Sequence, residues 1–97
     1  MRKAINPPNA PSAIGTYNQG IETDGLVFTS GQVGIDPSTG QLVDGGIDMQ
    51  AAQTLKNIEV ILSSVDLGKE SIVKLTVFVK NLDDFPSVNK AFENFFN

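Results

Sequence analysis

The sequence predicts one small domain of the α+β class, and three observations support this prediction. Short apolar stretches separated by an Asp-Gly pair indicate a β-hairpin near residues 16–29. Apolar residues then recur every three or four positions over residues 47–65, which indicates a helix. An alternating stretch at residues 72–80 indicates a strand, and a second helical pattern follows it. This order of elements favours helices packed on one face of a sheet.

The N-terminal part is expected to hold a loop and then the hairpin. Residues 6–13 contain three of the five prolines, which fix φ and remove backbone donors, so this stretch predicts an extended loop. Strands are expected over residues 16–22 and 26–29. The Asp24-Gly25 pair between them is a strong hairpin turn signal.

A second turn is expected where the sequence reads Asp36-Pro37-Ser38-Thr39-Gly40. Proline suits the second position of a type I turn, and glycine can take a positive φ where the chain re-enters a strand. Residues 41–43 are then expected to form a brief strand.

The first helix is expected over residues 47–65, with Asp44 or Asp48 capping its start and Gly68 ending it in the left-handed conformation. Asn57 belongs to the polar sides in this pattern. The predicted apolar face consists of Ile47, Ala51, Leu55, Ile58, Leu62 and Val65.

Residues 72–80 give the clearest strand pattern, because valine and leucine occupy every second position from Val73 to Val79. Asp83 is expected to cap a second helix, with Pro86 in a first turn that needs no amide donor. The predicted apolar face of this second helix consists of Phe85, Val88, Phe92, Phe95 and Phe96. A further strand is expected after the helix.

Composition excludes several kinds of site. The absence of cysteine and histidine removes disulfides, thiolate or imidazole metal sites, and Ser-His or Cys-His catalysis. The net charge is −4 and the seven basic residues are scattered, so nucleic-acid binding is disfavoured. No signal peptide or membrane-spanning stretch is apparent, and a cytoplasmic protein with no membrane contact is expected. Its small size makes an oligomer plausible.

Two places carry residues suited to a small-ligand site. Tyr17 lies between glycines on an expected strand, and Ser30-Gly31 follows the next strand, where glycine lets a ligand approach the backbone. Each place is also explained by structure alone, as a packed aromatic and as a bulge or turn. No carboxylate group has metal-ligand spacing, and no phosphate-binding glycine motif is present.

Taken in order, these stretches resemble the RidA/YjgF family of reactive intermediate deaminases. The resemblance covers residues 1–97 as a single domain, which is about the first three quarters of the family domain. The matching residues are Asn9 to Pro11, Gly15 to Gln19, Thr29 to Gln32, Asp36 to Gly40, Gln53 to Ile58, Val73 to Val79, Asp83 to Asn89, and Phe95-Phe96.

The resemblance implies a chorismate-mutase-like fold, in which a sheet carries two helices on one face, here without the family's C-terminal strands. It implies a homotrimer with ligand sites in the clefts between subunits. The implied activity is that of a 2-iminobutanoate/2-iminopropanoate deaminase, a hydrolase that converts reactive enamines and imines such as 2-aminoacrylate to 2-keto acids and ammonia. The family needs no metal and no organic cofactor.

Four residues match binding or lining positions of the family: Tyr17, Ser30, Gly31 and Asn89. The family's substrate-clamping arginine and water-orienting glutamate lie after the second helix, so no catalytic residue is assigned in this chain. Arg2, its only arginine, lies at the other end. The alternative is a non-catalytic trimeric protein that binds a small ligand or a partner on the same scaffold. RNA cleavage, a third hypothesis, is disfavoured by the negative charge and the lack of histidine.

Overall fold

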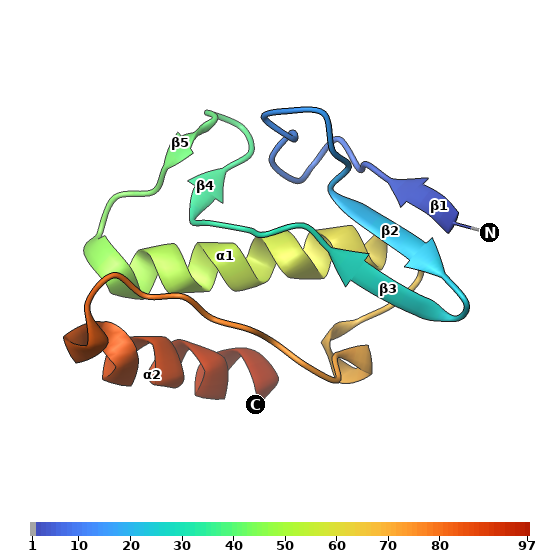
Figure 1. The fold of residues 1–97 in the computed structure, drawn as a ribbon. Helices are drawn as coiled ribbons and strands as arrows, with labels where there is room; N and C mark the ends of the chain where they lie inside the picture. The colour runs from blue at the N-terminus through green and yellow to red at the C-terminus, as the bar shows by residue number, and fades with distance from the viewer. Residues whose placement is uncertain (1) are drawn as a thin grey trace.

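The computed structural model describes residues 2–97, which form two small antiparallel sheets and two helices (Figure 1). The long helix α1 lies between the strands on one side and α2 on the other. This arrangement confirms the predicted α+β class. The elements are β1 (Arg2–Ile5), β2 (Gly20–Thr23), β3 (Leu26–Thr29), β4 (Ile35–Asp36), β5 (Gln41–Leu42), α1 (Gly46–Ser63), two short 3₁₀ turns at Lys69–Ser71 and Leu82–Asp84, and α2 (Phe85–Phe96).

The predicted hairpin is confirmed in β2 and β3, which pair from Gly20 opposite Thr29 to Thr23 opposite Leu26. Asp24 and Gly25 connect them with φ values of 50° and 79°. Positive φ at both central residues defines the hairpin turn that matches the strand twist. Strand β2 begins at Gly20, later than expected, because the Gln19 amide donates to the Asn6 side chain instead of to a strand.

Strand β1 was not predicted. It pairs antiparallel with β2, so the three-stranded sheet has the order β1-β2-β3. Of its four residues, only Ile5 is buried, and so the strand lacks the apolar alternation that would reveal it. Ile5 joins Ala10 and Ile61 in the buried core.

The predicted turn at Asp36 joins β4 and β5 as expected. The Gly40 amide donates to the Asp36 carbonyl at 2.8 Å, with φ of 74° at Gly40. The Ser38 hydroxyl and amide both donate to one carboxylate oxygen of Asp36, at 2.7 and 2.8 Å. These hydrogen bonds, the hydroxyl's first, lower the pKa of Asp36 from its ordinary value of 3.8.

Helix α1 is buried on two sides, whereas the sequence predicted one apolar face. Ile61, fully buried, packs against Ile5 and Ala10 of the N-terminal segment. Leu55 is also buried and lies beside the groove between α1 and α2. The second buried side escaped prediction because it includes a polar residue, Asn57.

Asn57 is 1% exposed, so its assignment to a polar side was wrong. Its side-chain NH₂ group donates to the carbonyls of Val33 and Ile35, at 3.2 and 2.9 Å, and its oxygen accepts from the Gln53 side chain at 2.8 Å. The segment between these carbonyls lies directly on α1, because a Cβ added at Gly34 would lie 2.7 Å from a backbone atom of α1. Asn57 therefore fixes the chain after β3 to the helix.

The residues predicted to cap and to end α1 were wrong. Gly45, with φ of 109°, precedes the helix, and neither Asp44 nor Asp48 caps it, because no side chain forms a cap hydrogen bond there. At the other end Asp66, not Gly68, has the left-handed conformation, with φ of 61°. The Leu67 amide then donates to the Leu62 carbonyl at 3.0 Å, and the Asp66 amide to the Ser63 carbonyl at 3.1 Å. This pair of bonds is a Schellman ending.

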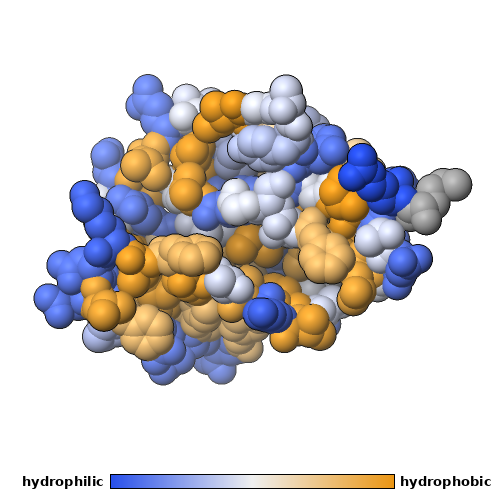
Figure 2. Space-filling model, in the orientation of Figure 1, coloured by the Kyte–Doolittle hydropathy of each residue, from blue (hydrophilic) through white to orange (hydrophobic). Residues whose placement is uncertain are grey.

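Residues 72–80 are extended but are not a strand, which corrects the prediction. Within residues 2–97 the backbone amides of 73–80 have no hydrogen-bond partner, and no strand lies against them. The side chains of Val73 and Phe78 are 90% and 93% exposed. Figure 2 shows apolar side chains gathered on this face of the molecule. The alternating pattern predicted an extended backbone correctly, but a strand also requires a neighbour.

Helix α2 packs along α1 through Val88, which is buried, and through the half-buried Phe92 and Phe95. Phe85 and Phe96, predicted on the same face, are 55% and 44% exposed. Among residues 2–97, no helix combines the length and the apolar character that crossing a bilayer requires.

Both ends of α2 have polar contacts. Before the helix, the Asn81 side chain accepts a hydrogen bond from the Asp83 amide at 2.9 Å and so caps the 3₁₀ turn Leu82–Asp84. The prediction that Asp83 caps the second helix was therefore wrong. At its end, the Lys69 ammonium donates to the Phe95 carbonyl at 2.6 Å and lies 5.3 Å from the Phe95 ring centre. A cation is favoured at this end of a helix.

Replacing the buried Asn57 by alanine removes the donors to the partly buried carbonyls of Val33 and Ile35. We expect Asn57→Ala to lower the free energy of unfolding by about 2–3 kcal/mol. Urea unfolding followed by circular dichroism measures this loss. Asn94→Ala, at an exposed position of α2, is the control and is expected to change stability by less than about 0.5 kcal/mol. Equal effects of the two substitutions would contradict the role given to Asn57.

Replacing Ser38 by alanine removes the hydroxyl that donates to Asp36, so we expect the pKa of Asp36 to rise. Because folding lowers this pKa, the carboxylate stabilises the folded state above pH 3.8, and the contribution disappears as the pH falls through the folded value. The stability difference between native protein and Ser38→Ala should therefore shrink on acidification. An NMR titration of the Asp36 carboxyl carbon measures the pKa, with Ser63→Ala as the control. An unchanged value in Ser38→Ala would refute the assignment.

Candidate functional site

A small hollow lies between the loop that precedes β2 and the segment that follows β3. Its volume is about 50 Å³, enough for about three water molecules. Two of the predicted site residues, Tyr17 and Gly31, line it. The full lining consists of Pro11, Ser12, Ala13, Ile14, Tyr17, Gln19, Gly31, Gln32, Val33 and Ile35.

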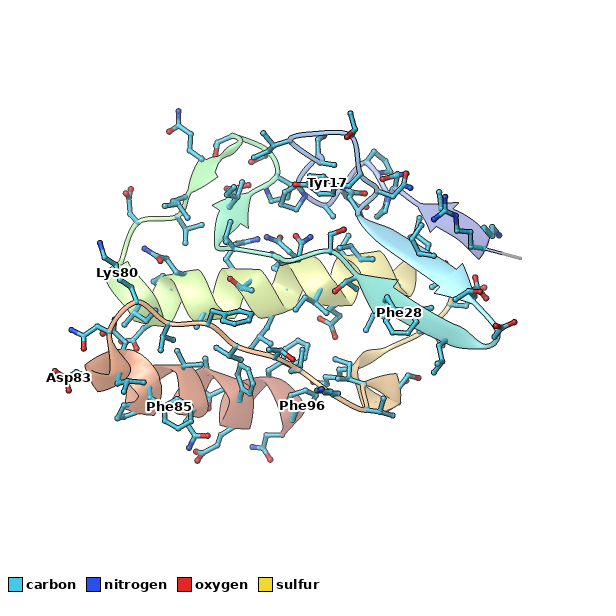
Figure 3. All side chains as sticks on the ribbon, in the orientation of Figure 1. Tyr17, Phe28, Lys80, Asp83, Phe85 and Phe96 are labelled. Atoms are coloured by element: carbon cyan, nitrogen blue, oxygen red, sulfur yellow. The ribbon has the colours of Figure 1, made fainter. Side chains whose placement is uncertain are left out.

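Tyr17 lies in the loop above β2, and its side chain is 52% exposed (Figure 3). The Tyr17 hydroxyl oxygen accepts a hydrogen bond from the Ile14 amide at 3.2 Å. This bond closes the loop on itself. The ring thus forms one wall of the hollow while its hydroxyl proton remains available to a ligand.

Gly31 lines another wall of the hollow, and the neighbouring Ser30 does not line it. The Ser30 amide donates to the Gln19 carbonyl at 2.9 Å, and the Ser30 hydroxyl donates to the Asn18 carbonyl at 2.5 Å. The hydroxyl therefore holds the two walls together. No atom lies within 4 Å of a Cβ added at Gly31, so the backbone there is open to a ligand.

Gln19 also lines the hollow, and the sequence analysis did not select it. Its side chain is 4% exposed. Its side-chain nitrogen donates to the carbonyls of Ala10 and Pro11, at 3.1 and 2.5 Å, and its amide donates to Asn6 at 2.9 Å. Nothing in the local sequence distinguishes this glutamine from an exposed one, because its partners lie eight to thirteen residues earlier.

Asn89, the fourth predicted residue, lies apart from the other three. It is exposed on α2, and α1 separates that helix from the loop of Tyr17 (Figure 3). A larger groove of about 450 Å³ runs between α1 and α2, with Asp48 and Lys90 among its lining residues. Asn89 lines neither this groove nor the hollow. Within one chain, therefore, the structure brings together Tyr17, Ser30 and Gly31 only.

The lining of the hollow sets its chemistry. Within residues 2–97 its polar groups are backbone amides and carbonyls, the Tyr17 hydroxyl, and the side chains of Ser12, Gln19 and Gln32, and none of them is charged. The same part of the chain holds no group of three or more side chains suited to bind a metal ion. These groups can orient a small polar molecule by hydrogen bonds.

The chain is similar to proteins of known name. Residues 7–97 match the family model described as Endoribonuclease L-PSP. The 2-iminobutanoate/2-iminopropanoate deaminase of Salmonella typhimurium is 46% identical over 96 residues, which span 99% of this chain and 74% of that protein. The mouse protein of the same name is 43% identical, over 99% of this chain and 71% of the other.

Solved structures show the same fold. The YjgF gene product of Escherichia coli superimposes with a TM-score of 0.91 at 44% identity, over 97% of this chain and 73% of that one. Escherichia coli TdcF with bound serine superimposes with a TM-score of 0.92 at 38% identity, also over 97% of this chain and 73% of that one. YyfA of Yersinia pestis, described as a member of the conserved Rid protein family, superimposes with a TM-score of 0.96 at 40% identity, over 100% of this chain and 77% of that one. The chain therefore belongs to the Endoribonuclease L-PSP family, which includes the Rid and YjgF proteins.

Proposed function

We propose that this chain is a subunit of a deaminase that hydrolyses small reactive imines and enamines to 2-keto acids and ammonia. The observation that supports this proposal is the similarity to 2-iminobutanoate/2-iminopropanoate deaminases, at 41–46% identity over almost the whole chain. The hollow between Tyr17 and Gly31 is the place where we expect the substrate to bind.

The proposed reaction makes modest demands on the protein. Water adds to the carbon of the C=N bond, and the resulting carbinolamine collapses to the 2-keto acid and releases ammonia. Because a protonated imine is already a good electrophile, the main requirement is a positioned substrate and an oriented water molecule. The open backbone at Gly31 and the hydroxyl of Tyr17 can supply hydrogen bonds for that positioning.

The proposal includes a homotrimer with the ligand sites between subunits. Its support is the separation of Asn89 from the hollow within one chain, together with the absence of charged lining residues in the part of the chain described. A substrate carboxylate is bound best by a cationic side chain. A neighbouring subunit could bring its Asn89 or a lysine to this hollow.

The second candidate function is that of a non-catalytic protein of the same architecture that binds a small ligand. The observation that favours it is the uncharged lining, which contains no carboxylate and no lysine. We do not propose RNA cleavage, because a phosphate-binding surface needs clustered basic residues and the chain carries a net charge of −4.

The deaminase proposal is tested by adding the protein to a threonine dehydratase reaction, which releases the imine. We expect the imine, trapped by semicarbazide and followed by absorbance, to disappear faster than in buffer. Ammonia and 2-oxobutanoate should appear in equal amounts. If the rate does not exceed that in buffer although the ligand still binds, the non-catalytic alternative replaces the proposal.

The location of the site is tested by filling the hollow. Gly31→Val places two methyl groups where no atom lies within 4 Å of the new Cβ, so we expect the free energy of unfolding to change by less than about 0.5 kcal/mol. Affinity for 2-oxobutanoate should fall by at least about tenfold. Fluorescence reports binding at the hollow, because Tyr17 is the only tyrosine and there is no tryptophan.

Thr76→Val introduces the same residue at an exposed position outside the hollow and serves as the control. If Gly31→Val folds and binds 2-oxobutanoate as tightly as this control, the ligand does not occupy the hollow.

A further inference from the structure

The orientation of the Gln19 side chain is determined by its partners. Both acceptors near its nitrogen are backbone carbonyls, those of Ala10 and Pro11, at 3.1 and 2.5 Å. An amide rotated by 180° would place its oxygen against these two oxygens. The NH₂ group must therefore face the carbonyls, and Oε1 must lie on the other side of the amide.

Oε1 of Gln19 has no hydrogen-bond partner within residues 2–97, although the atom is buried. It is the one buried side-chain nitrogen or oxygen atom in this part of the chain without a partner. Buried polar atoms are nearly always paired, because an unpaired one loses its hydration without compensation. Because Gln19 also lines the hollow, a molecule bound there can supply the missing donor if the wall shifts enough to expose Oε1.

The neighbours of Gln19 support this interpretation. The residue lines the hollow together with Tyr17 and Gly31, the two predicted binding residues that line it. Two hydrogen bonds hold the backbone of Gln19: its amide donates to the Asn6 side chain, and its carbonyl accepts from the Ser30 amide. Because backbone and amide nitrogen are both fixed, Oε1 is held at one place in the wall, as a specificity group requires.

We propose that Gln19 Oε1 accepts a hydrogen bond from an N–H group of the ligand, and that it thereby selects the nitrogen-containing substrate over the 2-keto acid product. The inference rests on the function proposed above. An imine or its protonated form presents an N–H donor to the amide oxygen. The product presents a carbonyl oxygen at the same position, which cannot donate, so two acceptors would face each other and the product would bind more weakly.

Gln19 has a second role that the experiment must separate from this one. Its nitrogen holds the loop at Ala10 and Pro11, so a substitution also loosens one wall of the hollow. A loosened wall lowers the affinity for all ligands alike, whereas loss of the acceptor lowers the affinity only for ligands that carry an N–H donor. A pair of ligands with the same carbon skeleton distinguishes the two effects.

The experiment compares 2-aminobutanoate, which carries an ammonium group, with 2-oxobutanoate, which carries none. Gln19→Met keeps the length of the side chain and removes both its donor and its acceptor. We expect the affinity for 2-aminobutanoate to fall about tenfold, the effect of one hydrogen bond to a charged donor. The affinity for 2-oxobutanoate should fall only by the part that loosening of the wall causes, so the loss should be clearly smaller than that for 2-aminobutanoate. Fluorescence of Tyr17 measures both titrations, and circular dichroism verifies folding.

Gln41→Met, at an exposed position on β5, is the matched control and should leave both affinities unchanged. An equal loss for both ligands in Gln19→Met, or no loss for either, overturns the inference and leaves the proposed function intact. If neither ligand changes the Tyr17 signal of the native protein, both the inference and the proposed binding site fail.

A measurement on the native protein covers the case in which Gln19→Met does not fold. The side-chain carbonyl carbon of Gln19, observed by NMR, should shift when 2-aminobutanoate is added and should remain unchanged with 2-oxobutanoate. The same shift with both ligands, or no shift with either, contradicts the proposed hydrogen bond.

Discussion

The hydrogen bonds from Asn57 to the carbonyls of Val33 and Ile35 are the constraint on which the site depends. They join the middle of α1 to the segment that leaves β3, and this segment carries Gly31 at its start. The Val33 carbonyl lies in the loop after β3 and the Ile35 carbonyl at the start of β4, and the buried Asn57 side chain donates to both. Because Asn57 does so from a rigid helix, one wall of the hollow has a fixed position.

The other wall is fixed by the same kind of interaction. Gln19 holds the carbonyls of Ala10 and Pro11, and Ser30 ties its own wall to that of Gln19. Two buried amide side chains thus position loops that have little regular secondary structure. The apolar core at Ile61 supplies most of the driving force for folding, whereas the amides determine where the loops lie.

Local patterns predicted part of the regular structure, although they missed β1 and wrongly predicted a strand at residues 72–80. The hairpin at Asp24-Gly25, the turn at Asp36 and the extent of α1 all followed from local sequence. The roles of Asn57 and Gln19 could not be predicted, because each depends on carbonyls 8 to 24 residues away. For the site, the sequence singled out Tyr17 and Ser30-Gly31, and the structure places Tyr17 and Gly31 at one hollow, whereas the position of Asn89 relative to them requires the structure.

The extended segment at residues 72–80 has a consequence for how the protein behaves at high concentration. The amides of its residues 73–80 have no partner within residues 2–97, and it carries exposed apolar side chains such as Phe78. An extended backbone of this kind is the part of a chain where another strand can add with the least rearrangement. Lys74 and Lys80 are the charges that oppose such addition, since like charges repel when two copies of the segment align. Salt weakens that repulsion, so we expect self-association through this segment to increase with ionic strength.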